Sequence, residues 1–426
     1  MSARNDSPGS RRGRLLPLWV LCASVLAFYG PALTRPFTSE DYLLIRFLAE
    51  NPPWRDLRSL FIAPWLGISV VKFYRPAATL LYGVEIALFG GHPLGYNTVH
   101  LLVHMANTLL FWAIARRLCR GFTPFAAALL FALYPLHPNA ILFGASFATL
   151  FGAFFMLAAF LAYQRFRESG SAAAWGGALA LFVLALGSYE AAVVLPLLLA
   201  AYDHLVAARK KVLAYLPFFG VLGLYLLLRK WIFGVFVGGY AEAGQRLLAP
   251  DVRQMAGDLA TSIYQLHLPV YDRTPGTWEA VVVCALLIGA PLAFWRLRGS
   301  GHARLWLFSW VWIVLAQAPF AFRPSVPANG RYWYLAAAGT AMSIAFLARW
   351  LFAVTRPPWR LLAPAAAVLL AASWSLLLTV YVGATVEAGR TARRVQTEIL
   401  RIGRAPREIF VTRYPYFVLS SSQVPI

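Results

Sequence analysis

Two adjacent carboxylates, Glu40 and Asp41, have the residue types and the position to carry chemistry in this chain. They follow the first strongly hydrophobic segment and lie within a more polar stretch, residues 34–76. A pair of carboxylates close to a bilayer surface is costly to keep unless water, a cation or a substrate contacts it. We therefore interpret Glu40 and Asp41 as the centre of a catalytic site.

Other polar side chains flank hydrophobic segments on what we predict to be the same membrane face: Arg75, His137, Glu190 and Arg331. Acidic, basic and guanidinium groups that converge at one membrane face suit group transfer on an anionic, lipid-linked substrate. Simpler interpretations stay open for each group. Glu190 would also fit a solvated turn, and Arg331 would fit an interfacial anchor within an aromatic belt.

One hydrophobic segment carries four polar residues, Asn97, His100, His104 and Asn107, at intervals of three, four and three. This spacing places them on one face of a helix. Such a face serves either as a hydrogen-bonded seam between helices or as a surface that contacts substrate. A zinc site is less favoured, because no third ligand has a suitable spacing.

The elements that position these groups are membrane helices. Hydrophobic residues make up 60% of the chain and charged residues 13%, and the mean hydropathy is +0.63. This composition is typical of a polytopic helical membrane protein. The formal net charge of +21 comes mainly from arginines in short predicted loops, where they set topology and contact lipid phosphates. No basic-aromatic pattern indicates a nucleic-acid partner.

We predict an all-α fold with about eleven transmembrane helices and a cytoplasmic N-terminus, because Arg11, Arg12 and Arg14 precede the first span. The partition is a tail (1–14), a membrane domain (15–383) and a short external tail (384–426). A large first external loop, 34–93, carries interfacial helices, one of them at 77–89. The predicted spans cover residues 15–33, 94–118, 124–134, 141–163, 172–187, 191–205, 213–228, 278–295, 305–320, 332–352 and 361–383.

The order of several short motifs resembles a known family. They are Glu40-Asp41, Tyr74-Arg75-Pro76, Gly91-His92-Pro93-Leu94-Gly95-Tyr96 followed by His104, Pro135-Leu136-His137, Ser188-Tyr189-Glu190, and Arg331-Tyr332-Trp333-Tyr334-Leu335. In this order they resemble the GT-C glycosyltransferases, specifically the protein O-mannosyltransferase-like group and its relatives with tetratricopeptide repeats. Those repeats do not occur in this sequence.

The resemblance implies transfer of a mannose-like hexose from a polyprenyl-phosphate sugar to an acceptor hydroxyl on the external face, with inversion. Asp41 would be the general base, and Glu40 would orient it or share a divalent cation with it, although the sequence requires no metal. Arg75 and Arg331 would stabilise the departing phosphate. The further substrate-binding residues would be Tyr74, His104, His137, Glu190 and Tyr332. The acceptor would be a protein, a lipid or a polysaccharide.

Two other functions stay open. Many spans and buried polar groups also fit a transporter or lipid flippase, although no internal repeat is visible. Phe147 and Thr149 depart from the family pattern on the fourth span, which favours a non-catalytic scaffold with the same fold. The preference for arginine over lysine fits a GC-rich bacterium, so we expect a bacterial inner-membrane location.

Overall fold

The computed structural model describes residues 11–38, 40–65, 72–207, 211–236, 252–269, 285, 289, 292–296, 298, 302–320, 330–354 and 362–402. Most of the predicted span 278–295, most of the predicted tail and the side chain of Glu40 lie outside this part. Every regular element within it is helical. The α-helices are α1 (Arg11–Tyr29), α2 (Glu40–Glu50), α3 (Leu57–Ile62), α4 (Pro76–Phe89), α5 (Pro93–Leu118), α6 (Thr123–Ala132), α7 (Pro138–Ile141), α8 (Phe147–Ser169), α9 (Ala172–Leu186), α10 (Leu195–Ala201), α11 (Val212–Phe233), α13 (Val252–His267), α15 (Ala303–Gln317), α16 (Tyr334–Val354) and α17 (Leu362–Ile402).

Within the described residues, seven segments are long and apolar enough to cross a membrane. They are Leu15–Ala32, Pro93–Leu118, Phe147–Ser169, Val212–Phe233, Ala303–Phe320, Gly330–Ala353 and Ala365–Glu398. The chain is therefore an integral, multi-pass membrane protein. The count of eleven is not confirmed: α6 and α9 have only 10 and 15 residues, and a straight span needs about 20.

The largest departures from the predicted limits occur in three spans. The fourth begins at Phe147 rather than residue 141, because Pro138 starts the separate short helix α7 and a 3-10 turn, η4 (Gly144–Ser146), follows it. The sixth is divided into the 3-10 helix η5 (Glu190–Val194), α10 and the π-helix η6 (Tyr202–Val206). The last, α17, continues beyond residue 383 to Ile402, with Glu–Arg pairs of i,i+3 spacing along its polar end.

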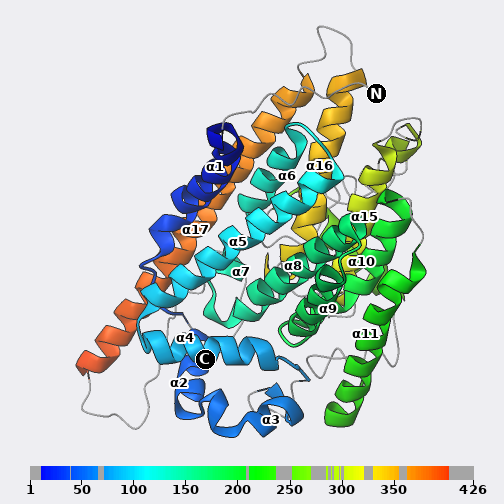
Figure 1. Cartoon of the computed structure of the whole chain (residues 1–426). Coiled ribbons are helices and arrows are strands. Elements are labelled where there is room, and N and C mark those ends of the chain that lie inside the picture. The colour runs from blue at the N-terminus through cyan, green and yellow to red at the C-terminus, as the bar shows by residue number, and fades with distance from the viewer. Residues whose placement is uncertain are drawn as a thin grey trace.

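Helix α4 lies across one end of the bundle, with α2 and α3 on its outer side (Figure 1). Its N-terminus is fixed by backbone hydrogen bonds, since the amides of Ala77 and Ala78 both donate to the Gly187 carbonyl, at 2.9 and 3.4 Å. Its packed face includes Tyr82, Glu85 and Ile86, all buried. The helix predicted at 77–89 is therefore present, and it closes the end of the bundle that carries Asp41. Its location at the membrane interface stays a prediction.

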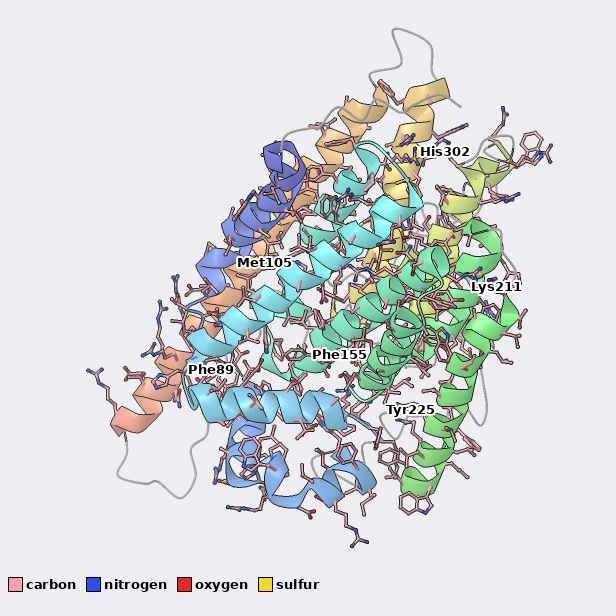
Figure 2. The ribbon with its side chains drawn as sticks, in the orientation of Figure 1. Phe89, Met105, Phe155, Lys211, Tyr225 and His302 are labelled. Carbon is pink, nitrogen blue, oxygen red and sulfur yellow. The ribbon has the colours of Figure 1, made fainter. Side chains whose placement is uncertain are left out.

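Cationic side chains gather at the opposite end. There Arg117 at the end of α5 pairs with Glu168 of α8, and Arg349 of α16 donates to the carbonyl of Arg120. Figure 2 shows Lys211 and His302 toward this end and Phe89 toward the other, with Met105 and Phe155 between them. The helices thus alternate in direction as the loop arginines predicted. We call this the basic end.

Candidate functional site

The Asp41 carboxylate is completely buried and is held by the loop that precedes it. Its Oδ2 accepts hydrogen bonds from the Thr38 amide (3.0 Å), the Thr38 hydroxyl (3.4 Å) and Arg35 Nη2 (3.4 Å). The Arg35 side chain is only 1% exposed. Burial lowers the pKa of the Arg35 guanidinium, and the nearby Asp41 charge opposes that shift.

A second segment closes over this ion pair. Arg35 Nη2 also donates to the carbonyl of Leu142, and Asn97 Nδ2 donates to the carbonyls of Leu33 and Arg35, at 3.0 Å each. A β-carbon built on Gly144 would lie 2.7 Å from Asp41 Oδ1 and 3.0 Å from the Tyr82 hydroxyl oxygen. Only glycine therefore fits at this position without a shift.

Tyr82, on α4, lies beside Gly144 and the Asp41 carboxylate. Its ring stacks on Phe147 at a centroid distance of 4.2 Å, and its buried hydroxyl has no hydrogen-bond partner among the described residues. Burial raises the pKa of Tyr82 well above its ordinary value, and the charge of Asp41 raises it further. The phenol therefore stays protonated beside the carboxylate and is available as a donor.

Arg75 and Glu190 form a second polar cluster at the start of α4. Arg75 Nε lies 3.1 Å from both carboxylate oxygens of Glu190, and Nη2 lies 2.9 Å from Oε2. The guanidinium also packs over the rings of Phe73 (4.1 Å), Trp65 (5.3 Å) and Tyr189 (5.3 Å). Both partners keep some exposure, 11% and 21%. The two motifs, which the sequence analysis placed at one face without predicting an ion pair, meet directly in the structure.

Arg331 joins this second cluster through Tyr189. Burial raises the pKa of Tyr189, whereas the positive charges of Arg75 and Arg331 lower it, so both guanidinium groups lie within electrostatic reach of this phenol. Arg331 Nη2 contacts the hydroxyl of Tyr332 at 3.3 Å, and the ring of Tyr332 packs on Phe320 at 4.9 Å. Arg331 and Tyr332 are half-buried.

Helix α4 fixes the spacing of the two clusters. Arg75 is its N-cap residue and Tyr82 lies seven positions later, so the two are separated along the axis by about 10 Å at 1.5 Å per residue. Tyr74, beside Arg75, is 7% exposed and packs against Tyr225 and Phe233 at 6.0 and 6.5 Å. In this structure Tyr74 supports the cluster from within and does not line an open surface.

The polar face of α5 forms contacts between helices. His100 Nε2 lies 3.3 Å from Oε2 of the buried Glu85. His104 Nε2 lies 3.1 Å from the Ala132 carbonyl, so Nε2 carries the proton and Nδ1 accepts from the Tyr334 hydroxyl at 2.7 Å. Asn107 Nδ2 donates to the same hydroxyl at 3.1 Å. Of the two alternatives for this face, a hydrogen-bonded seam between helices and a surface that contacts substrate, the structure contains the seam.

His104 and His137 do not line a cavity here, which differs from the predicted substrate contacts. Both are fully buried, and both ring nitrogens of His104 are already engaged. The ring of His137 packs on the rings of Tyr334 and Phe131, at centroid distances of 4.4 and 4.9 Å. Burial lowers the pKa of His137 well below its ordinary value, so its ring is neutral.

Three residues of the site were missed in the sequence: Arg35, Tyr82 and Gly144. A signal existed for Arg35, an arginine at a membrane exit six positions before Asp41. Tyr82 and Gly144 lie in apolar surroundings, and no local pattern distinguishes them. No group of three or more histidine, cysteine, aspartate or glutamate residues suited to a metal was found among the described residues. The cation predicted at Glu40 and Asp41 therefore stays a prediction.

No protein-family profile matches the chain. It is 26% identical over 180 residues to human protein O-mannosyl-transferase TMTC3, a match that covers 41% of this chain and 20% of that protein. It is 29% identical over 203 residues to human protein O-mannosyl-transferase TMTC2, with 45% and 24% covered. The chain thus matches no more than about a quarter of the length of these relatives.

The fold is also found among solved structures. The archaeal oligosaccharyltransferase AglB from Archaeoglobus fulgidus, in complex with an inhibitory peptide and a dolichol-phosphate, matches with a TM-score of 0.53 at 12% identity. The match covers 95% of this chain and 62% of AglB. The structure of an Archaeoglobus fulgidus oligosaccharyltransferase tethered with an acceptor peptide gives a TM-score of 0.51 at 13% identity, with 89% of this chain and 56% of that chain covered. Together with the TMTC similarity, this confirms the resemblance to GT-C, O-mannosyltransferase-like membrane proteins.

Proposed function

We propose that this chain is an integral-membrane glycosyltransferase that transfers a mannose-like hexose from a polyprenyl-phosphate sugar to an acceptor hydroxyl. The observation that carries the proposal is the buried Asp41 carboxylate. It borders Gly144 together with Tyr82, which lies about 10 Å along α4 from Arg75, the partner of Glu190. One end of a phosphosugar would meet a carboxylate and the other would meet guanidinium groups. The similarity to proteins named O-mannosyl-transferases supports the same class.

In the proposed reaction, Asp41 takes the proton of the acceptor hydroxyl while the hydroxyl oxygen attacks the anomeric carbon. The bond from that carbon to the phosphate oxygen breaks, and polyprenyl phosphate leaves with the electron pair. Attack opposite the leaving group inverts the anomeric configuration. Arg75 and Arg331 stabilise the charge that develops on the phosphate. The Arg75 guanidinium packs over the Tyr189 ring, and Tyr332, beside Arg331, is linked to the same ring through Phe320.

The structure corresponds to a closed state under this proposal. Asp41 is 0% exposed, and its oxygens face Thr38, Arg35 and the backbone at Gly144. An acceptor hydroxyl reaches the carboxylate only after the turn at Leu142–Ser146 moves away. Opening this turn would break the hydrogen bond between the Leu142 carbonyl and Arg35, the same residue that binds Asp41.

The test uses purified protein in nanodiscs, labelled polyprenyl-phosphate hexoses and a membrane extract as acceptor source. We expect transfer by the wild type and none by Asp41→Asn. Asp56→Asn is the matched control, since Asp56 is an exposed carboxylate in the same loop that caps α3 through Ser59, and asparagine also caps. Wild-type turnover by Asp41→Asn would remove Asp41 as the base.

A second variant separates the phosphate role from the base. Arg331→Ala should raise the donor concentration needed for half-saturation and leave acceptor saturation unchanged. If no hexose donor supports transfer by folded wild-type protein, a lipid-flipping assay in proteoliposomes becomes the next experiment, because a flippase of the same fold would bind the same lipid phosphate.

A further inference from the structure

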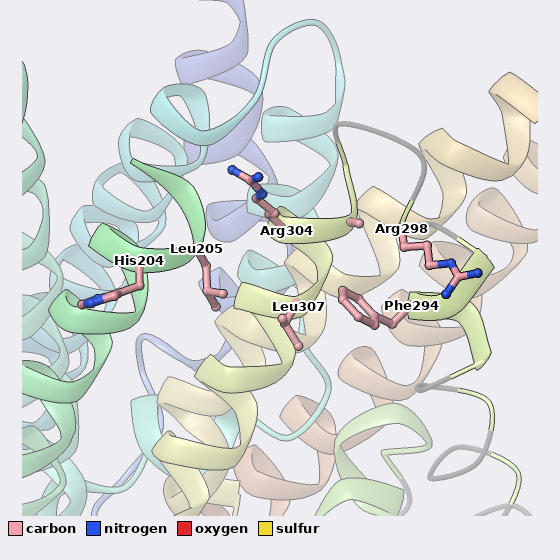
Figure 3. Close-up of a pocket in the computed structure, with 7 residues that line it drawn as sticks. His204, Leu205, Phe294, Arg298, Arg304 and Leu307 are labelled. Atoms are coloured by element: carbon pink, nitrogen blue, oxygen red, sulfur yellow. The ribbon is translucent and has the colours of Figure 1, made fainter. Parts of the chain in front are cut away.

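A pocket of about 500 Å³ opens at the basic end of the bundle (Figure 3). It lies between the π-helix η6 and the start of α15. The lining side chains are His204, Leu205, Phe294, Arg298, Ala303, Arg304 and Leu307. Figure 3 shows the apolar side chains of Leu205, Leu307 and Phe294 in the middle of this group, with the guanidinium groups of Arg304 and Arg298 extending outward above and to the right of them. It contains none of the residues assigned to the transfer reaction.

The π-helix that forms one wall is locked in place. Asp203 is completely buried, and its carboxylate accepts from the Tyr163 hydroxyl and from Arg167 Nε, at 2.8 Å each. π-Helical turns are rare and occur frequently at functional sites. The next two residues, His204 and Leu205, are held at the pocket by this anchored turn.

The cations of the rim differ from their neighbours in lacking anionic partners. Arg117 and Arg167, at the same end, pair with Glu168 and Asp203. No carboxylate in the described part of the chain lies within ion-pair distance of Arg298 or Arg304, and both side chains are exposed. The Arg298 guanidinium also packs over the ring of Trp295, 4.8 Å from its centroid. Cations that have no carboxylate partner among the described residues and lie beside an apolar floor match the two halves of a phospholipid, whose phosphate joins a charged headgroup to hydrocarbon chains.

We propose that this pocket binds the phosphate headgroup of an anionic phospholipid. Arg298 and Arg304 contact the phosphate, and the first methylene groups of the lipid pack on Leu205, Phe294 and Leu307. The inference does not depend on the proposed glycosyl transfer, because the site lies at the other end of the bundle and its test measures binding alone. Arginine-rich loops of this kind face the anionic cytoplasmic leaflet under the positive-inside rule.

Native mass spectrometry of delipidated protein tests the proposal, with phosphatidylglycerol, phosphatidylcholine and inorganic phosphate as probes. Wild type should retain phosphatidylglycerol in preference to phosphatidylcholine. Arg298→Gln/Arg304→Gln should weaken retention by roughly 30-fold, at about 1 kcal/mol per arginine. Leu307→Trp keeps every charge and fills the pocket, so it should also abolish the preference. Arg296→Gln, an exposed neighbour outside the lining, should bind as wild type.

Each outcome decides the proposal. Equal loss in Arg296→Gln and in the double variant would indicate general surface charge and overturn the site. Undiminished retention in Leu307→Trp would overturn it as well. Displacement of the lipid by millimolar inorganic phosphate would assign the rim to free phosphate and refute the lipid. Each variant is first checked for wild-type elution in gel filtration. If the double variant does not fold, the single arginine substitutions and Leu307→Trp are compared.

Discussion

Arg35 and Asp41 should be energetically coupled, and the loss of one partner should cost far more than the loss of both charges. Their side chains are 1% and 0% exposed and meet at 3.4 Å. Removing one partner of a buried pair leaves an uncompensated charge, which typically costs about 3–5 kcal/mol. We therefore expect Arg35→Ala to lower the free energy of unfolding by about that amount.

A double-mutant cycle with Asp41→Asn measures the coupling. In Arg35→Ala/Asp41→Asn no buried charge is left unpaired, so the double variant should be more stable than the sum of the two single effects by at least about 1 kcal/mol. The assay is equilibrium unfolding in mixed micelles, followed by tryptophan fluorescence. Additivity within about 0.5 kcal/mol would refute the reasoning, because uncoupled residues add in this way.

The matched control lies in the same loop. Arg46 forms an i,i+4 ion pair with Glu50, and these side chains are 79% and 61% exposed. Exposed pairs contribute about 0–1 kcal/mol. Arg46→Ala should therefore leave the unfolding curve nearly unchanged. A loss comparable to that of Arg35→Ala would mean that any arginine truncation in this loop destabilises the protein, and that burial of the pair is not the cause.

Three further predictions concern the packed polar groups. Gly144→Ala places a methyl group 2.7 Å from Asp41 Oδ1. Overpacking of this kind should lower the free energy of unfolding by about 1–3 kcal/mol, and the variant should turn over the donor more slowly. A fully active variant with a wild-type thermal midpoint would contradict this. Tyr334→Phe removes the hydroxyl that contacts His104 and Asn107 and should cost about 1–2 kcal/mol in the same unfolding assay; an unchanged curve would show that neither contact contributes. Burial lowers the pKa of His137. Below about pH 6.5 the His137 side chain is therefore protonated in the unfolded chain and neutral in the folded chain. The free energy of unfolding should fall by about 1 kcal/mol per pH unit below that value. His137→Phe should remove this part of the slope in unfolding curves measured from pH 5 to 8, and an identical slope would exclude His137 as its source.

The relative placement of residues a few positions apart was predicted correctly from the sequence, because helix geometry alone fixes which of them share a face. The intervals from Asn97 to Asn107 put four polar groups on one face of α5, as observed. The apolar run at 77–89 predicted α4 within one residue. The choice between seam and substrate contact for that face was not decidable locally, since Tyr334 lies 230 positions from His104.

The sequence by itself determined the membrane class, the limits of several helices to within a few residues and the groups worth testing. Hydropathy, helix period and arginine placement decide these features because they act over short stretches of chain. Only the tertiary structure decided which of those groups meet. It buried Asp41 against Arg35, brought Gly144 over the carboxylate and joined Arg75 to Glu190 across 115 positions. Burial and contact depend on how α4, α5 and α8 pack together, and many sequence patterns are compatible with each packing.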